Sequence, residues 1–118
     1  MRQAGVIGAG ALYALRHNRE RLVEDHAKAQ RVAEAIRQCE SLRLIPDQID
    51  TNIVIFEVDR SIGSAANFVA ALESRGIRTL TVSPTRVRVV THLDVSMDDV
   101  EAACEIICSV AEQACRLA

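Results

Sequence analysis

The residues of this chain best suited to chemistry lie between positions 86 and 96, which read Arg-Val-Arg-Val-Val-Thr-His-Leu-Asp-Val-Ser. Because side chains alternate between the two faces of a β-strand, one face carries Arg86, Arg88, Val90 and His92. A guanidinium on a rigid strand suits a carboxylate or phosphate, since its planar fork donates two parallel hydrogen bonds. Charge of this kind is also typical of an edge strand with one solvated face. The stretch therefore predicts either an anion site or a solvated edge.

A reactive amine is a second requirement of many enzymes, and Lys28 is the single lysine beside thirteen arginines. A Schiff-base lysine is normally desolvated or placed next to another cation. Lys28 instead follows Glu24 and Asp25 in a segment rich in charged residues. We expect this segment to present a solvated helix face and Lys28 to have no catalytic role.

The cysteines and histidines offer no metal-binding pattern. The chain contains no C-x-x-C pair, and its three histidines are far apart in sequence, so neither zinc nor another metal site is predicted. The four cysteines are Cys39, Cys104, Cys108 and Cys115. The last three fall on or near one face of a predicted helix, where two cysteines do not usually meet disulfide geometry. We expect reduced thiols in a cytoplasmic protein.

Composition excludes several other classes of protein. With 118 residues, the chain is long enough for one domain with a core. A net charge of −2 and only three aromatic residues argue against nucleic-acid binding. No stretch is long and apolar enough to cross a bilayer.

The hydrophobic pattern predicts helices that alternate with short strands. Helices are expected over 5–17, 19–39 and 64–75, and a last helix is expected from 97 with an apolar stripe that reaches residue 114. Strands are expected over 41–44, 52–58, 77–82 and 86–92. The near-continuous apolar run in 52–58 indicates a strand covered on both faces, and 77–92 indicates a hairpin. Ser96 and Asp99 have the spacing of a capping box at the last helix. The small residues of 5–17 predict close packing on another segment, which can lie within this chain or outside it.

This order predicts an α+β fold. We expect a two-layer sandwich in which helices pack on a small, mainly antiparallel sheet of three or four strands, preceded by an N-terminal helical segment. The whole of 1–118 is expected to be one domain, with helical connecting segments over 1–40 and a small α/β domain over 41–118.

Four stretches in this order resemble one enzyme family. They are Met-Arg-Gln-Ala-Gly at 1–5, Glu-Asp-His-Ala at 24–27, Thr-Asn-Ile-Val at 51–54 and Arg-Val-Val-Thr-His-Leu-Asp-Val-Ser at 88–96. Together they resemble the C-terminal part of low-specificity L-threonine aldolases, which are pyridoxal-phosphate enzymes of fold type I, the aspartate aminotransferase fold. The resemblance implies the small domain of such an enzyme, without the large domain that binds the cofactor.

The resemblance also implies roles for two residues. Arg88 matches the arginine that binds the α-carboxylate of the amino-acid substrate, and Arg2 matches an arginine close to the cofactor, on its phosphate side. No catalytic residue is implied, because Lys28 does not match the Schiff-base lysine. His92 and Asp94 belong to the shared motif and are expected only to fix the turn into the last helix. Arg86 has no implied role.

Three functions remain open at this point. The full enzyme would split threonine or allo-threonine into glycine and acetaldehyde, with this chain inactive alone and no cofactor bound to it. Alternatively, the chain is a non-catalytic module that assembles into a homo-oligomer. It could also be the small domain of a related aminotransferase or β-eliminating lyase. Without the rest of the pocket, we expect Arg88 to be exposed or paired with a local acid.

Overall fold

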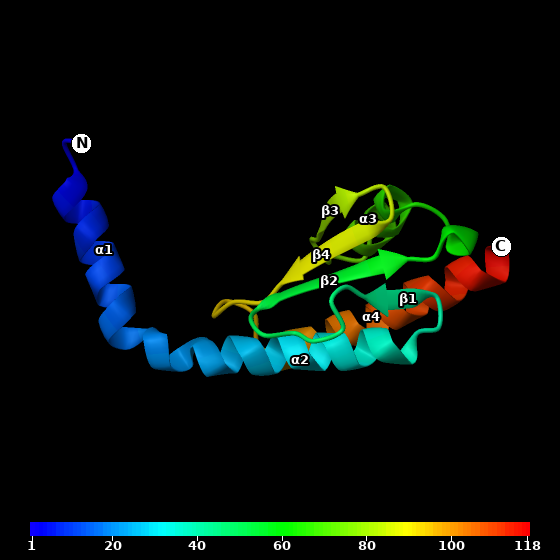
Figure 1. The fold of residues 1–118 in the computed structure, drawn as a ribbon, viewed down its shortest axis with the longest axis horizontal. Coiled ribbons are helices and arrows are strands. Elements are labelled where there is room, and N and C mark those ends of the chain that lie inside the picture. The colour runs from blue at the N-terminus through cyan, green and yellow to red at the C-terminus, as the bar shows by residue number, and fades with distance from the viewer.

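The structure is a computed structural model that describes all 118 residues (Figure 1). The helices are α1 (Ala4–His17), α2 (Leu22–Gln38), α3 (Ala65–Glu73) and α4 (Met97–Leu117), with short 3₁₀ turns η1 (Arg19–Arg21) and η2 (Arg60–Ile62). The strands are β1 (Leu42–Leu44), β2 (Ile53–Val58), β3 (Leu80–Ser83) and β4 (Arg86–Val90). The predicted α+β class and the number of strands are confirmed.

The four strands form one antiparallel sheet in the order β1-β2-β4-β3. β3 and β4 form the predicted hairpin. β4 therefore lies between β2 and β3, and the interpretation of 86–92 as a solvated edge strand is wrong. An inner strand has both rows of backbone groups paired, so its charged face cannot be explained as protection of a free edge.

The helices cover one face of the sheet and leave the other open. The core joins apolar residues of α2, α3 and α4 to alternate residues of the strands, including Val54, Phe56 and Val87, which are fully buried. Phe56 packs edge-on against Phe68 of α3, with ring centroids 5.9 Å apart. The sheet and the helices on one of its faces are the two layers of the predicted sandwich, and one apolar core lies between them.

The prediction that the second strand is covered on both faces is wrong. Burial alternates along β2, and Ile53 on its outer face is 43% exposed. The register places Ile53 opposite Val90, Ile55 opposite Arg88 and Glu57 opposite Arg86. The apolar run in β2 thus supplies both the core and part of the open face.

Two strand boundaries differ from the predicted ones. β3 begins at Leu80 instead of residue 77, because the Ile77 N–H donates to the carbonyl of Leu72 (3.0 Å) and closes the end of α3. Gly76, at φ 85°, provides the left-handed residue that this closure requires. β4 ends at Val90 instead of residue 92. The two residues that follow leave the ladder to contact α2.

The predicted capping box begins α4. The Ser96 hydroxyl accepts the Asp99 N–H at 3.1 Å, and the Asp99 carboxylate accepts the Ser96 N–H at 2.9 Å. The Ser96 hydroxyl also donates to the Asp99 carboxylate at 2.6 Å. This hydrogen bond, followed by the one from the Ser96 N–H, lowers the pKa of Asp99 because both favour the charged carboxylate. The cap fixes where the connection from β4 ends.

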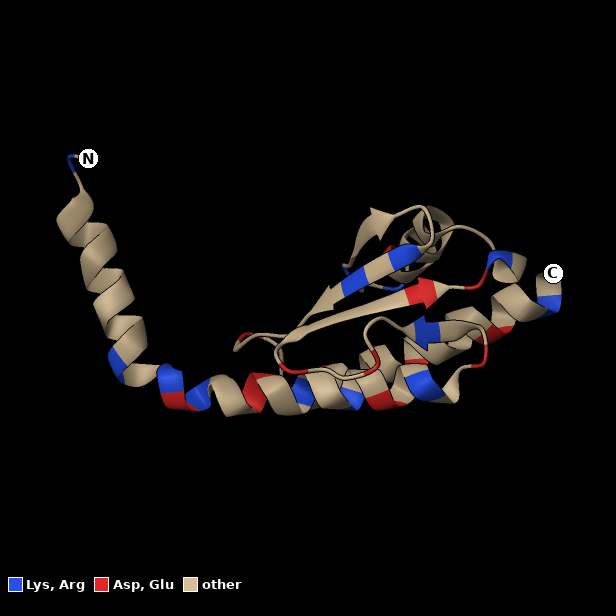
Figure 2. Cartoon of the chain, viewed as in Figure 1, with Lys and Arg blue, Asp and Glu red and all other residues tan.

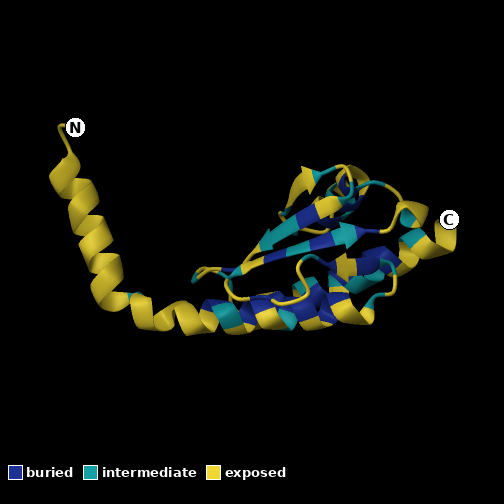
Figure 3. Cartoon of the chain, in the orientation of Figure 1, coloured by how far each residue is buried: buried dark blue, intermediate teal, exposed yellow.

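The first helix projects away from the sheet and packs on nothing in the chain (Figures 1 and 3). None of its 14 residues is buried, and Val6 and Tyr13 are 73% and 61% exposed. The chain consequently measures 54 × 28 × 25 Å. None of the helices combines the length and the apolar character needed to cross a membrane.

Candidate functional site

On the open face of the sheet, the two arginines of β4 have different neighbours. Arg86 lies opposite Glu57 of β2, and Arg43 of β1 lies on the other side of Glu57. Glu57 forms an ion pair with Arg43, and the Arg86 Nε lies 3.8 Å from the Glu57 carboxylate. Both arginines help to lower the pKa of Glu57, with the hydrogen bond from Arg43 as the largest cause. Arg86 therefore has an anion within this chain, the Glu57 carboxylate.

Arg88 has only apolar neighbours across the ladder. It lies opposite Ile55 of β2 and Leu80 of β3. The side chain is half-buried, no carboxylate oxygen lies within 4.0 Å of its nitrogens, and its Nε is buried without any hydrogen-bond partner. The expectation that Arg88 is exposed or paired with a local acid is therefore wrong. A buried donor without a partner carries a desolvation cost that an external anion would relieve.

A cavity of about 280 Å³ opens beside Arg88. It is lined by Arg78, Thr79, Leu80, Arg88, Val90 and His92, and by no acidic residue. The Thr79 hydroxyl oxygen is the other buried side-chain polar atom that lacks a partner. Both orphaned polar atoms of the chain therefore belong to residues of this one cavity. Its cationic lining without an acid makes an anion the matching ligand.

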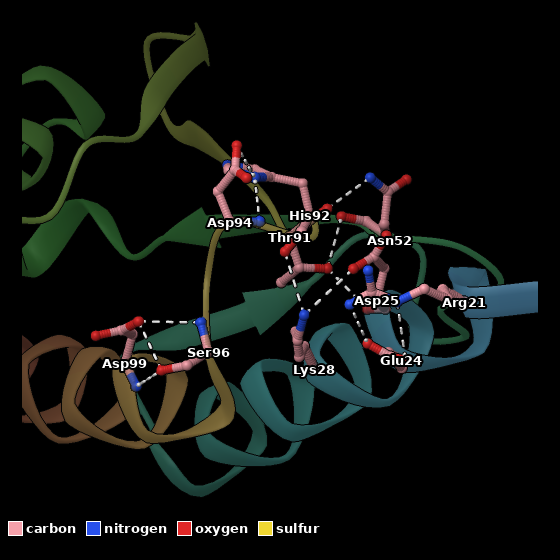
Figure 4. Close-up of polar contacts among 10 residues, drawn as sticks. All are labelled: Arg21, Glu24, Asp25, Lys28, Asn52, Thr91, His92, Asp94, Ser96 and Asp99. Atoms are coloured by element: carbon pink, nitrogen blue, oxygen red, sulfur yellow. Dashed lines mark hydrogen bonds and ion pairs between the residues drawn. The ribbon is translucent and has the colours of Figure 1, made fainter. Parts of the chain in front are cut away.

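A second polar cluster lies where β4 meets α2, and sequence reasoning did not find it. Lys28 Nζ donates to the Asp25 carboxylate at 3.3 Å and to the His92 carbonyl at 3.2 Å (Figure 4). The side chains of Lys28 and Asp25 are only 8% and 6% exposed. The prediction that this charged segment is solvated is therefore wrong for both residues, which face the sheet. The amine of Lys28 donates two hydrogen bonds within the chain, and Lys28 lines none of the five main cavities.

Thr91 and Asn52 complete this cluster. The Thr91 hydroxyl donates to the Asp25 carbonyl at 2.7 Å, and the Asn52 side-chain amide donates to the Thr91 carbonyl at 2.7 Å. The Thr91 N–H returns a hydrogen bond to the Asn52 carbonyl at 3.0 Å. Thr91 is 2% exposed. The cluster ties the end of β4 to α2 and to the start of β2, and so holds His92 at the rim of the Arg88 cavity.

His92 and Asp94 shape the turn that follows. The His92 Nδ1 accepts the Asp94 N–H at 3.3 Å and lies 3.7 Å from the Asp94 carboxylate (Figure 4). Both side chains are more than half exposed. Their contacts to each other agree with the role expected of them in fixing the turn.

Arg2 lies at the far end of the projecting α1, exposed and remote from the sheet (Figure 2). The structure does not bring it together with Arg88, so its role beside a cofactor stays a prediction. No group of three or more His, Cys, Asp or Glu side chains is arranged to hold a metal ion.

Known proteins share both the sequence and the fold. The sequence model of the Beta-eliminating lyase family matches residues 1–61, more than half of the chain. This chain belongs to the Beta-eliminating lyase family. Two of its lyase relatives are the low-specificity L-threonine aldolase 1 of Arabidopsis thaliana, 35% identical over 101 residues, and the low specificity L-threonine aldolase of Escherichia coli K12, 37% identical over 98 residues. The resemblance to threonine aldolases is confirmed.

These matches cover 85% and 83% of this lyase-family chain but 28% and 27% of the two relatives. The chain thus spans less than a third of the length of the curated relatives it matches. Its fold resembles part of the ornithine delta-aminotransferase of Plasmodium falciparum, with a TM-score of 0.64 and 16% identity over 82% of this chain and 26% of that one. The predicted likeness to part of a fold-type-I enzyme is confirmed at the level of the fold.

Proposed function

We propose that this chain is part of a threonine-aldolase-like lyase and that its Arg88 cavity binds the α-carboxylate of the amino-acid substrate. The observation that carries the proposal is the buried Nε of Arg88, which has no partner in a cavity without acids. A carboxylate would accept from the Arg88 fork and from the Thr79 hydroxyl. The apolar Leu80 and Val90 beside it would strengthen these bonds by excluding water.

Such binding would position the substrate rather than move a proton. In the complete enzyme, threonine or allo-threonine would be split into glycine and acetaldehyde, and pyridoxal phosphate would supply the electron sink. A carboxylate held on an inner strand fixes the orientation of the Cα–Cβ bond relative to the cofactor, and orientation lowers the entropic part of the barrier.

The residues of this chain do not fit pyridoxal phosphate by themselves. Lys28 is the single lysine, and its amine already donates to Asp25 and to the His92 carbonyl in a buried cluster. We therefore propose that the chain alone is inactive and that a cofactor contact by Arg2 would arise only in a larger assembly. Pure chain mixed with pyridoxal phosphate and L-threonine should release no acetaldehyde. A Schiff-base absorption band that disappears in Lys28→Ala would contradict this.

The carboxylate site can be tested without catalysis. In proton–nitrogen NMR spectra, titration with acetate, glycine or L-threonine should shift the amide signals of Thr79 and Arg88 and the Arg88 Nε–H signal saturably. Arg88→Gln should lose this response, whereas the matched control Arg86→Gln, on the same face but beside Glu57, should keep it. Thr79→Val should weaken binding by roughly 10- to 100-fold, the worth of one hydrogen bond to a charged group. The proposal fails if Arg88→Gln responds like the unmodified chain.

A second candidate function is assembly, and the exposed α1 is the observation that favours it. Its apolar side chains, including Val6, Ile7, Leu12 and Leu15, are exposed and pack on no other element of this chain. We propose that they pack on a second copy of the chain, for which the small residues Gly5 and Gly8 leave room. Sedimentation equilibrium should give the mass of a dimer, and Leu12→Glu in α1 should return it to the mass of a monomer. A monomer at every accessible concentration would remove this candidate.

We also propose a cytoplasmic location, for which the four cysteines without a disulfide are the support. Labelling of all four thiols in a freshly lysed, acid-quenched cell extract would test it.

An aminotransferase or another lyase reaction in the complete enzyme would use the same carboxylate site, and the NMR titration does not depend on which of these reactions follows.

A further inference from the structure

The largest of the five main cavities is lined by three of the four cysteines, at the opposite end of the α2–α4 pair from the Lys28 cluster. Its volume is about 580 Å³. Cys39 and Cys108 lie in its wall together with Cys115, and the charged residues of the lining are Glu40, Glu112 and Arg116. Neither the carboxylate site nor the assembly proposal uses this cavity.

Two of these thiols are in direct contact. The Cys39 Sγ lies 3.0 Å from the Cys108 Sγ, although the two residues are 69 positions apart. Cys39 is the first residue after α2, in the connection to β1, and Cys108 lies in the middle of α4. A disulfide needs the two sulfurs to approach to about 2.05 Å, which small side-chain rotations and the non-helical backbone of Cys39 can provide.

The surroundings assign different roles to the two thiols. Burial, followed by the hydrogen bond and charge of Cys108, raises the pKa of the Cys39 thiol to about 12, so Cys39 is protonated at neutral pH. The Cys39 S–H donates to the Cys108 Sγ, so Cys108 is the acceptor of the pair and is assigned the first attack. Once Cys108 is bonded to another sulfur, its contribution to the raised pKa of Cys39 disappears, and Cys39 can act as the second thiol.

We propose that Cys39 and Cys108 are an oxidisable dithiol that forms a reversible disulfide between the end of α2 and α4, with a low-molecular-weight disulfide such as oxidised glutathione as the co-reactant. The Cys108 thiolate attacks one sulfur of the co-reactant, its S–S bond breaks, and one glutathione thiolate leaves. The Cys39 thiol then loses its proton to solvent and attacks the Cys108 sulfur, which releases the second glutathione. In total, two protein thiols become one disulfide and one glutathione disulfide becomes two thiols.

The other two cysteines provide matched controls. Cys104 lies one turn before Cys108 on α4, but it is buried, and its sulfur faces the Arg31 carbonyl at 3.8 Å. Burial raises its pKa to about 11. Cys115 is exposed and lies two turns beyond Cys108 on the same helix. If solvent exposure decided which thiol is oxidised, Cys115 would react. If the contact between the two sulfurs decides it, Cys39 and Cys108 will form the disulfide.

The test uses the full chain equilibrated with excess oxidised glutathione, quenched by alkylation and digested with trypsin and a protease that cleaves after glutamate. These cuts separate the four cysteines into the peptides 38–40, 102–105, 106–112 and 113–116. We expect a mass loss of two hydrogens and a disulfide that joins 38–40 to 106–112. The disulfide should persist in Cys115→Ser and Cys104→Ala and vanish in Cys39→Ser and Cys108→Ser.

Thermal unfolding gives an independent readout on the unmodified sequence. The oxidised chain should unfold roughly 10 °C above the reduced chain, because the new bond closes a long loop, and dithiothreitol should reverse the shift. The proposal is overturned if glutathione remains attached to Cys108 while Cys39 stays alkylatable. It is also overturned if the only disulfides join Cys115 residues of two chains, or if all four thiols remain free.

Discussion

Two regions at the same end of β4 hold a cation away from full solvent, and they treat it in opposite ways. Lys28 on α2 has a carboxylate and a carbonyl within hydrogen-bond distance, and the neighbouring Thr91 and Asn52 groups are also paired. Arg88 on β4 has no partner for its Nε, and the Thr79 hydroxyl beside it has none either. The first cluster meets the hydrogen-bonding needs of its buried polar groups within the chain, whereas the second leaves two of them without a partner.

The same contrast holds between the two arginines of β4, at closer range. Arg86 and Arg88 are separated by one residue and point to the same face. Register places Glu57 opposite one and Ile55 opposite the other. An arginine that already has a carboxylate has little to gain from a second anion, so position on the sheet leaves Arg88, and not Arg86, for the proposed substrate contact.

The largest loss of unfolding free energy is expected when one partner is removed from the Lys28 cluster. Asp25→Ala leaves the Lys28 charge buried with only the His92 carbonyl, and loss of one partner of a buried ion pair costs about 3–5 kcal/mol. We expect a loss of about 3 kcal/mol in urea unfolding. The double variant Asp25→Leu/Lys28→Met, which removes both charges, should recover most of it. A loss below about 1 kcal/mol in the single variant would mean that the cluster is solvated.

A smaller effect is expected at Thr91, which holds the same cluster by a neutral hydrogen bond. Thr91→Val keeps the shape of the side chain but leaves the Asp25 carbonyl without the hydroxyl at 2.7 Å. The loss should be about 1–2 kcal/mol in the unfolding free energy. Thr81→Val on the exposed β3 is the matched control and should stay within about 0.5 kcal/mol. Equal effects at the two positions would contradict the contrast between buried and exposed threonines.

Removal of Arg88 should lower the unfolding free energy less than Asp25→Ala or Thr91→Val. Arg88→Met retains the apolar stem between Ile55 and Leu80 and deletes a buried donor that has no partner. Replacing an unsatisfied polar group by an apolar one is nearly neutral or stabilising, so the unfolding free energy should change by less than about 1 kcal/mol. A large loss of stability would show that Arg88 is a structural residue like Lys28.

The smallest effect concerns Glu57, whose pKa is lowered by its hydrogen bond from Arg43 and by nearby Arg86. A carboxyl whose pKa is lower in the folded state than in the unfolded state stabilises the fold above its unfolded pKa. That contribution is lost as the pH falls through the folded pKa. The unfolding midpoint of Glu57→Gln should therefore fall less on acidification than that of the unmodified chain. Parallel acid profiles for the two would exclude a pH-dependent role for this pair.

Much of the fold was predictable because it depends on local signals. The capping box of Ser96 and Asp99, the Gly76 helix end and the 77–92 hairpin are short-range patterns, and each is present. The position of β4 inside the sheet was not predictable, because strand order depends on contacts between segments far apart in the sequence. The burial of Lys28 was missed for the same reason, since its partner His92 is 64 residues away.

The sequence by itself determined the residue types, the family resemblance and the presence of two arginines on one face of a strand. Those features follow from the order of side chains along a backbone of known periodicity. Only the tertiary structure decided that Glu57 neutralises Arg86, that Arg88 borders a cavity without an acid, and that Lys28 is unavailable as an amine. Whether a charged group is satisfied depends on which distant segments pack beside it, and that is fixed only when the sheet and its helical layer come together.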